Sequence, residues 1–205
     1  MKKHQFSKTK TFFTSDTHFG HSNIIWMCKR PYKDVEEMNQ ALINNWNSVI
    51  SDDDTVFHLG DFAFGGSALW NGVLDQLNGK IILIQGNHDR ANMRQGFMNR
   101  FELVTPQMQI EIDGRTVYLN HYPFLCYGGS YRGEENAVWA LSGHTHITKK
   151  DNNGKDFERL KYLFPTQYDV GVDFNDYKPL SFQEISDKIN FQVQNNVNLM
   201  YWVKS

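Results

Sequence analysis

Short apolar runs alternate with helix-spaced apolar positions in the first half of the chain. Residues 11–15, 55–59 and 81–85 have the length of buried strands and consist mainly of aromatic, β-branched and aliphatic side chains. Between them, residues 34–49 and 67–77 repeat apolar side chains every three or four positions, which is the spacing of one helix face. These positions are Met38, Leu42, Trp46, Val49, Trp70, Val73, Leu74 and Leu77. The alternation predicts a parallel sheet covered by helices.

Polar residues indicate where the helices begin. We expect Ser22 to cap a short helix over residues 23–28. Asp34 followed by Glu37 resembles a capping box and predicts the start of a longer helix. Ser67 is expected to cap the third helix in the same way.

The second half of the chain follows a different pattern. Residues 108–112 and 115–119 alternate with period two around Asp113-Gly114, which predicts a β-hairpin. Residues 138–141 and 168–172 are two further expected strands.

The C-terminal segment is expected to form a helix and a last strand. Phe182, Ile185 and Ile189 share one helix face, and residues 199–203 form an apolar run of strand length. The chain has no repeat, low-complexity tract or linker-like stretch. We therefore expect a single domain over residues 1–205 with two sheets.

Composition narrows the class of protein. The 205 residues are 40% hydrophobic and 14% aromatic, which is typical of a globular core, and the net charge is −2. This charge argues against a protein that coats nucleic acid, although a nucleotide substrate stays possible. Cys28 and Cys126 are isolated, so neither a zinc ribbon nor a disulfide framework is expected. Without an apolar signal segment or a membrane-length run, the chain is expected to be cytoplasmic.

Candidate metal ligands follow the apolar runs. Four successive runs each end in a ligand, and a fifth ends at Asn120-His121. The seven candidates are Asp16, His18, Asp61, Asn87, His121, His144 and His146. In α/β sheets such positions converge on one crevice beyond the carboxyl ends of the strands. Seven carboxylate, imidazole and amide ligands without a thiolate suit two adjacent divalent ions, with manganese, iron, zinc, nickel and cobalt as the candidates.

The order of these residues resembles the signature of the calcineurin-like metallophosphoesterase superfamily. Its blocks D-x-H, G-D, G-N-H-D, H and G-H-x-H occur in this order between Asp16 and His146. Residues 169–181 also resemble the small bacterial and phage members. The resemblance implies an α/β fold, a four-layer α/β/β/α sandwich with two central mixed β-sheets.

The resemblance also implies a role for each ligand. By motif, one metal is held by Asp16, His18 and His146 and the other by Asn87, His121 and His144. Asp61 would bridge the two ions, and a hydroxide between them would attack phosphorus in line. His88 would act as a general acid or transition-state donor, oriented by Asp89.

Several neighbouring residues have two open interpretations. His21, Arg90 and Arg132 are candidate contacts to the substrate phosphate, or solvent-exposed side chains of loops. Residues 127–133 are rich in glycine and are a candidate flap over the site.

Two aromatic residues near the candidate ligands and one histidine also have roles to assign. Tyr122 and Phe124 are candidates for stacking on a base or for packing beneath their loop. His58 lies inside an apolar run and is expected in the core.

The function expected from these residues is hydrolysis of a phosphoester, with a nucleotide among the candidate substrates. We favour a phosphodiesterase, with a phosphomonoesterase or a nucleotide pyrophosphatase as alternatives. A protein phosphatase is disfavoured because residues 60–66 and Asp89 differ from the motifs of that class. A metal-containing scaffold without activity is the alternative from another class, and the oligomeric state stays open.

Overall fold

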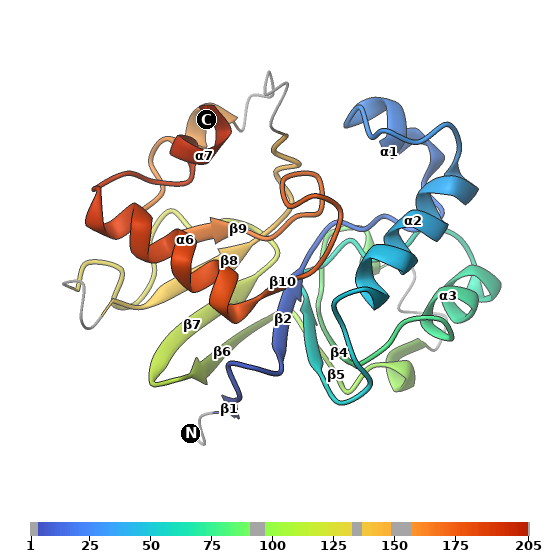
Figure 1. Cartoon of the computed structure of the whole chain (residues 1–205), viewed down its shortest axis with the longest axis horizontal. Helices are drawn as coiled ribbons and strands as arrows, with labels where there is room; N and C mark the ends of the chain where they lie inside the picture. The colour runs from blue at the N-terminus through green and yellow to red at the C-terminus, as the bar shows by residue number, and fades with distance from the viewer. Residues whose placement is uncertain (1–3, 91–96, 133–136, 149–156, 205) are drawn as a thin grey trace.

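The computed structural model describes residues 4–90, 97–132, 137–148 and 157–204. Two five-stranded mixed sheets pack against each other at the centre, and helices pack on both of them (Figure 1). Helix α6 (Phe182–Gln194) covers one sheet, and α2 (Val35–Asn47) and α3 (Ser67–Leu74) cover the other. The expected α/β/β/α sandwich is therefore confirmed.

The sheet beneath α2 and α3 has the strand order β10-β2-β3-β4-β5. Strands β2 (Thr11–Thr14), β3 (Thr55–His58) and β4 (Lys80–Ile84) pair in parallel, as the alternation of strands and helices predicts. The edge strands β5 (Leu103–Thr105) and β10 (Leu180–Ser181) were not predicted. They are too short to show a period-two pattern in the sequence.

The sheet beneath α6 has the strand order β1-β6-β7-β8-β9. Strands β6 (Gln107–Ile112) and β7 (Arg115–Asn120) form the predicted antiparallel hairpin. Strands β8 (Trp139–Ser142) and β9 (Gln167–Asp169) extend the sheet in parallel. The short strand β1 (His4–Phe6) pairs with β6 at the other edge.

The predicted starts of two helices were wrong by one residue. Helix α1 (Ser22–Met27) begins after His21, and α3 begins after Gly66, so neither Ser22 nor Ser67 caps its helix. The residues at the cap positions are His21 and Gly66, and no side-chain hydrogen bond caps either helix. Asp34 does cap α2 as expected, because its carboxylate accepts a 2.8 Å hydrogen bond from the Glu37 N–H.

The expected last strand is a helix, α7 (Met200–Lys204). Leu199, Met200 and Val203 are buried, and their spacing of one, three and four residues places them on one helical face. A run this short is compatible with either period, and packing against the core selects the helix. Two further short elements, α5 (Phe157–Leu160) and the 3₁₀ helix η1 (Phe97–Arg100), were not predicted.

Strands of the first sheet are apolar on both faces because both faces are covered. In β4, Ile82 and Ile84 join the cluster between the two sheets, whereas Ile81 and Leu83 join the cluster beneath the helices. Alternate side chains of a strand point to opposite faces, so a strand inside a sandwich is continuously apolar. This explains why the strand runs were visible in the sequence.

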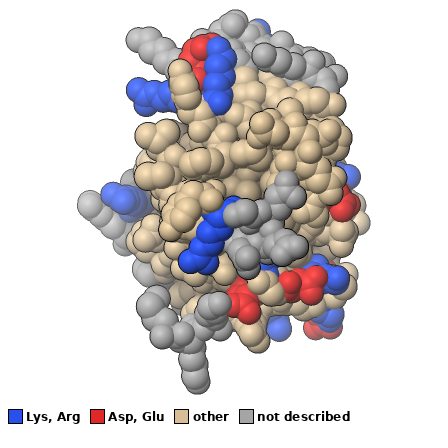
Figure 2. All heavy atoms as spheres, turned by 90° about the vertical axis from the view of Figure 1, so that its left-hand side faces the viewer, with Lys and Arg blue, Asp and Glu red and all other residues tan. Residues whose placement is uncertain are grey.

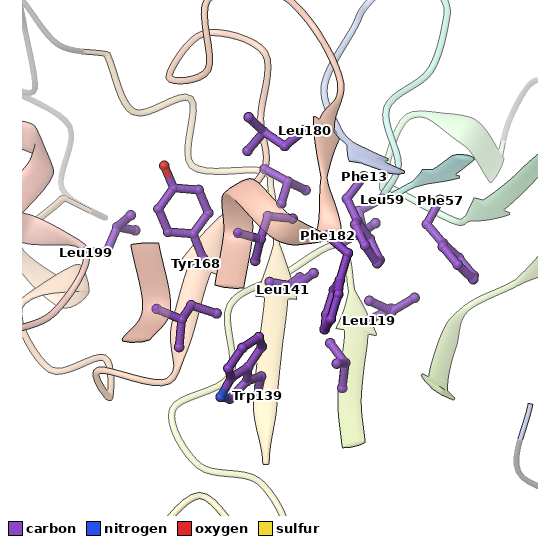
Figure 3. Close-up of a cluster of buried hydrophobic side chains, with 14 of the residues drawn as sticks. Phe13, Phe57, Leu59, Leu119, Trp139, Leu141, Tyr168, Leu180, Phe182 and Leu199 are labelled. Atoms are coloured by element: carbon purple, nitrogen blue, oxygen red, sulfur yellow. The ribbon is translucent and has the colours of Figure 1, made fainter. Parts of the chain in front are cut away.

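The cluster between the sheets joins distant parts of the chain. Figure 3 shows Phe13 and Phe57 of one sheet beside Leu119 of the other, with Phe182 of α6 against Trp139. The rings of Phe13 and Phe57 stack with centroids 5.3 Å apart. Each fully buried side chain of this size contributes about 1.5–3 kcal/mol. This packing fixes the two sheets, and hence their strand ends, against each other.

The cluster beneath α2 and α3 has the apolar faces that the sequence predicts. Met38, Leu42 and Trp46 of α2 and Trp70 of α3 are buried against the sheet. Val49 and Leu77, expected on the same faces, lie beyond the helix ends and are partly buried.

Charged side chains lie in small separate groups on the face shown in Figure 2, which is the left-hand side of Figure 1. Among the described residues in view, neutral side chains cover most of this face. No helix in the described part of the chain has the length and apolar character needed to cross a membrane.

His58 is fully buried in β3, as expected for a core residue. Its Nε2 lies 2.9 Å from Thr17 Oγ1, and the Thr17 hydroxyl is within 2.7 Å of the Phe62 carbonyl oxygen. Burial lowers the pKa of His58 to about 3. The folded protein therefore holds this ring in its neutral form.

This burial predicts a loss of stability in acid. The unfolded chain protonates His58 below about pH 6.5, whereas the folded chain does not until about pH 3, so stability falls as pH falls through this window. We expect His58→Gln to remove about 1.4 kcal/mol per pH unit from the slope of unfolding free energy between pH 6 and 4.5. Urea unfolding of both metal-free proteins measures the slopes, and equal slopes would contradict the prediction.

Candidate metal centre

The candidate ligands meet at one edge of the sandwich. Asp16, Asp61 and Asn87 follow β2, β3 and β4 of one sheet. His121 and His144 follow β7 and β8 of the other. The carboxyl ends of five strands therefore bring their side chains together, as the position of the ligands after apolar runs predicts.

Backbone turns at the strand ends aim these side chains inward. Five of the candidates have positive φ: Asp16 (58°), His18 (52°), Asp61 (55°), His144 (70°) and His146 (45°). Residues other than glycine adopt the positive-φ region of the backbone at an energetic cost, and such strained residues are concentrated at functional sites. The turns persist because the surrounding backbone holds them; the Asp16 N–H, for example, donates to the Gly60 carbonyl at 2.9 Å.

The first group of ligands consists of Asp16, His18 and His146. One donor atom from each lies within 4.8 Å of the others, and His146 Nε2 is 3.7 Å from Asp16 Oδ1. Asp16 Oδ1 and His18 Nε2 are buried without a hydrogen-bond partner. Buried polar atoms are rarely left so, which marks this space as one that a cation suits.

The second group consists of Asp61, His121 and His144, whose donor atoms also lie within 4.8 Å of one another. Asn87 adds a fourth donor atom, because its Oδ1 is 2.9 Å from His121 Nε2. The His121 Nδ1–H donates to the Leu59 carbonyl at 2.8 Å, which leaves Nε2 as a lone-pair atom. The lone pairs of His121 Nε2 and Asn87 Oδ1 face each other, and a cation between them would stabilise this arrangement.

Asp61 lies between the two groups. Its Oδ2 is 3.6 Å from His18 Nε2 in the first group and 3.5 Å from His121 Nε2 in the second. Its Oδ1 accepts a 2.9 Å hydrogen bond from the His88 N–H, which fixes the plane of the carboxylate. This is the position that a bridging ligand would occupy.

The protonation of the histidines also fits metal ligation. Burial lowers the pKa of His18, assisted by the nearby positive charge of His146 and Arg30, and burial lowers the pKa of His144. Both rings are therefore neutral and offer a lone pair. The donor set thus fits two adjacent divalent cations, with mixed nitrogen and oxygen ligands and no thiolate in either group.

Comparisons with known proteins agree with this arrangement. The calcineurin-like phosphoesterase superfamily domain matches residues 10–165. The chain belongs to the calcineurin-like phosphoesterase superfamily. An uncharacterised protein of Methanocaldococcus jannaschii is 35% identical over 181 residues, covering 87% of this chain and 90% of its own. The gene 66 protein of Mycobacterium phage L5 is 29% identical, covering 89% and 95%.

The fold is also similar to a solved structure. A protein of unknown function from Aquifex aeolicus superposes with a TM-score of 0.64 and 28% identity, covering 86% of this chain and 97% of that one. The phosphoesterase therefore has near full-length relatives in an archaeon, a bacterium and a phage.

A buried ion pair that we did not predict positions the first ligand group of this phosphoesterase. Asp173 Oδ2 accepts a 2.8 Å hydrogen bond from His146 Nδ1, and Arg30 binds both oxygens of Asp173 at 2.8 and 3.0 Å. Arg30 also donates to the backbone carbonyls of Asp16 and Thr17 at 2.7 and 2.8 Å. One guanidinium thus connects the D-x-H turn with the carboxylate that orients His146.

Charge stabilises this arrangement. Burial opposes ionisation of Asp173, but Arg30 and His146 outweigh it and lower its pKa. Burial likewise opposes protonation of His146, but the bond to Asp173 raises its pKa well above the usual value. A divalent ion at His146 Nε2 would take the place of that proton. The sequence did contain a signal for Asp173, because this residue follows the expected strand at residues 168–172, as the candidate ligands follow theirs.

Asp169 has a similar positioning contact to the G-H-x-H turn. The Thr145 hydroxyl, between His144 and His146, donates to Asp169 Oδ2 at 2.6 Å. Burial, reinforced by Asp16, raises the pKa of Asp169 to about 6.

Asp89 is not placed as we predicted. Its carboxylate accepts hydrogen bonds from the backbone N–H groups of Asp61, Phe62 and Gly86 at 2.8, 2.9 and 2.8 Å. Asp89 is fully buried, whereas the His88 side chain is 46% exposed, because adjacent side chains in this turn point in different directions. Asp89 therefore ties the turns after β3 and β4 together rather than orienting the His88 ring.

His88 and His21 lie beside the first ligand group. His88 Nε2 is 4.0 Å from Asp61 Oδ2, and its ring packs 4.8 Å from that of Phe64. His21 Nδ1 is 3.1 Å from His18 Nδ1, so His21 supports the orientation of His18. Contact of His21 with a substrate phosphate stays a prediction.

The other predicted contacts lie outside the buried cluster. Arg90 and Arg132 are exposed, and their binding to phosphate stays a prediction. The flap prediction covers residues 127–133, of which residue 133 lies outside the described residues. Phe124 packs near Tyr118 and Tyr127, with ring centroids 6.3 and 6.2 Å away, and so follows the packing interpretation.

The close approach of Gly86 to Asp61 gives a test of the centre. A Cβ at residue 86 would lie 2.2 Å from Asp61 Oδ1 and 2.5 Å from the Asp61 nitrogen, so Gly86→Ala must displace this carboxylate. We expect metal affinity to fall by about 10–100-fold. Metal titration by elemental analysis measures the change. Gly72→Ala is the control, because a Cβ there meets nothing within 4 Å; unchanged metal affinity in Gly86→Ala would contradict the placement of Asp61.

The buried ion pair gives a second test. Asp173→Asn keeps the side-chain shape but leaves Arg30 without its counter-charge, which typically costs about 3–5 kcal/mol. We expect this loss in urea unfolding together with weaker metal binding. Asp75→Asn is the matched control, because Asp75 pairs with Arg100 at the surface and its loss should cost less than about 1 kcal/mol. Equal losses of unfolding free energy in the two variants would contradict a larger contribution of the buried ion pair.

Proposed function

We propose that the chain is a phosphodiesterase that uses two divalent metal ions. The observation that carries the proposal is Asp61 Oδ2, which lies 3.6 and 3.5 Å from histidine nitrogens of two separate ligand groups. Two cations there would supply positive charge that polarises a phosphate and would lower the pKa of water in contact with them. Asp16, His18 and His146 would hold one ion, and Asn87, His121 and His144 the other.

His88 is the candidate proton donor of the reaction. Its side chain is half exposed at the mouth of the site, 4.0 Å from the Asp61 carboxylate. From there it can reach an oxygen that leaves the phosphorus, and a positioned donor typically contributes about 10²–10⁴-fold. The buried side of the site, with Asp16 and His18, is closed to water, whereas the His88 side is open to a substrate.

The test is hydrolysis of bis-p-nitrophenyl phosphate beside p-nitrophenyl phosphate, with manganese, nickel, zinc and magnesium in turn. We expect turnover of the diester that requires added metal, is lost in Asp61→Ala and falls by about 10²–10⁴-fold in His88→Ala. His4→Ala is the control, because His4 is an exposed histidine of β1. Preference for the monoester would favour a phosphomonoesterase. No turnover by protein with two bound ions would favour the scaffold alternative.

A further inference from the structure

A cavity of about 520 Å³ opens next to the second ligand group. His144 and Tyr122 belong to its wall, and their rings lie 4.6 Å apart. Tyr122 also packs 4.9 Å from the ring of His121, and its hydroxyl donates to Asn87 Oδ1 at 3.4 Å. The metal centre and the cavity therefore share a wall.

The rest of the wall is mainly apolar. Leu160 and Leu163 are buried beneath the cavity, and Leu125 and Tyr162 are each 74% exposed around it. Two large apolar side chains so exposed beside a candidate active site indicate a binding surface. The volume is within the range of about 300–1,000 Å³ typical of small-molecule sites.

The cavity wall is held in place by distant parts of the chain. Asn198 Nδ2 donates to the carbonyls of Lys161 and Leu163 at 2.9 and 3.0 Å, on either side of Tyr162. Thr145 and Arg159 add polar groups to an otherwise apolar lining. Tyrosine faces with a few polar groups are suited to a planar heteroaromatic ring, whereas an alkyl chain would use neither.

The position of the cavity suggests which part of a substrate it holds. His88 lies near His18 and Phe64, with ring centroids 5.8 and 4.8 Å away, whereas the cavity lies beside His144 and Tyr122. A group that leaves beside His88 is thus separate from a group held in the cavity. The cavity is placed to hold the ester group that stays on phosphorus.

We propose that this cavity binds the nucleoside of a nucleoside phosphodiester, with the base against Tyr122 and Tyr162. This assignment rests on the proposed function and adds a substrate class to it. It also supplies a reason for diester preference, because a monoester whose single organic group leaves beside His88 has nothing to place in the cavity.

The test compares two diesters with the same leaving group, the p-nitrophenyl ester of thymidine 5′-monophosphate and methyl p-nitrophenyl phosphate. We expect kcat/KM to be at least about tenfold higher for the nucleoside ester, from stacking of one base. Tyr162→Ala and Leu125→Ala should lower only that value and leave the methyl ester unchanged. Tyr162→Phe should retain it, and Tyr201→Ala, an exposed tyrosine outside the cavity, is the control.

Equal kcat/KM values for the two esters, or an equal loss for both in Tyr162→Ala, would overturn the assignment and leave the proposed function standing. If neither ester is hydrolysed, the proposed function fails. Calorimetric titration with thymidine 5′-monophosphate and methyl phosphate then tests whether the cavity binds the nucleoside. Tighter binding of the nucleotide that Tyr162→Ala abolishes would support the assignment. Equal binding of both would overturn it.

Discussion

The position of one buried carboxylate governs the whole centre. Asp61 sits in a left-handed turn, its N–H is bound by Asp89, and its Oδ1 is bound by the N–H of His88. A negative charge this deeply buried is costly unless hydrogen bonds or a cation offset it. The sandwich places lone-pair nitrogens of both ligand groups within 4 Å of it, where a metal ion would supply the positive charge. The packing of the sheets and the tight turns at the strand ends therefore together determine where these few atoms lie.

Local patterns predicted the helix-covered sheet and the strand ends, whereas the four-layer arrangement was implied by the family resemblance. Continuous apolar runs mark strands buried on two faces, and a polar residue after such a run lies at the sheet edge. Local patterns predicted the wrong element where packing against the core determines the secondary structure, as in the last helix at residues 200–204. The cap prediction at Ser22 failed for a different reason, because a serine at a helix start is only one of several ways to begin a helix.

Contacts between distant residues could not be read from one sequence. Arg30 and Asp173 are 143 positions apart, and nothing local distinguishes Arg30 from an exposed arginine. Asp89 showed the opposite problem, because its neighbour His88 suggested a contact with that ring, whereas the carboxylate binds three backbone N–H groups. The cavity beside Tyr122 combines the segment after β7 with α5, an element that the sequence did not reveal. The meeting of the candidate ligands at one edge was thus predictable, whereas most of the contacts that orient them were not.

The spread of the ligands along the chain links metal supply to folding. Each group of donors combines residues from the strand ends of two different sheets, so neither group exists until both sheets have assembled. An ion that binds only this assembled state shifts the folding equilibrium by mass action, by about 2.7 kcal/mol at a concentration 100-fold above its dissociation constant. If the centre binds metal as proposed, the divalent metal content of the surroundings would influence both the reaction at the site and how much of the protein survives proteolysis.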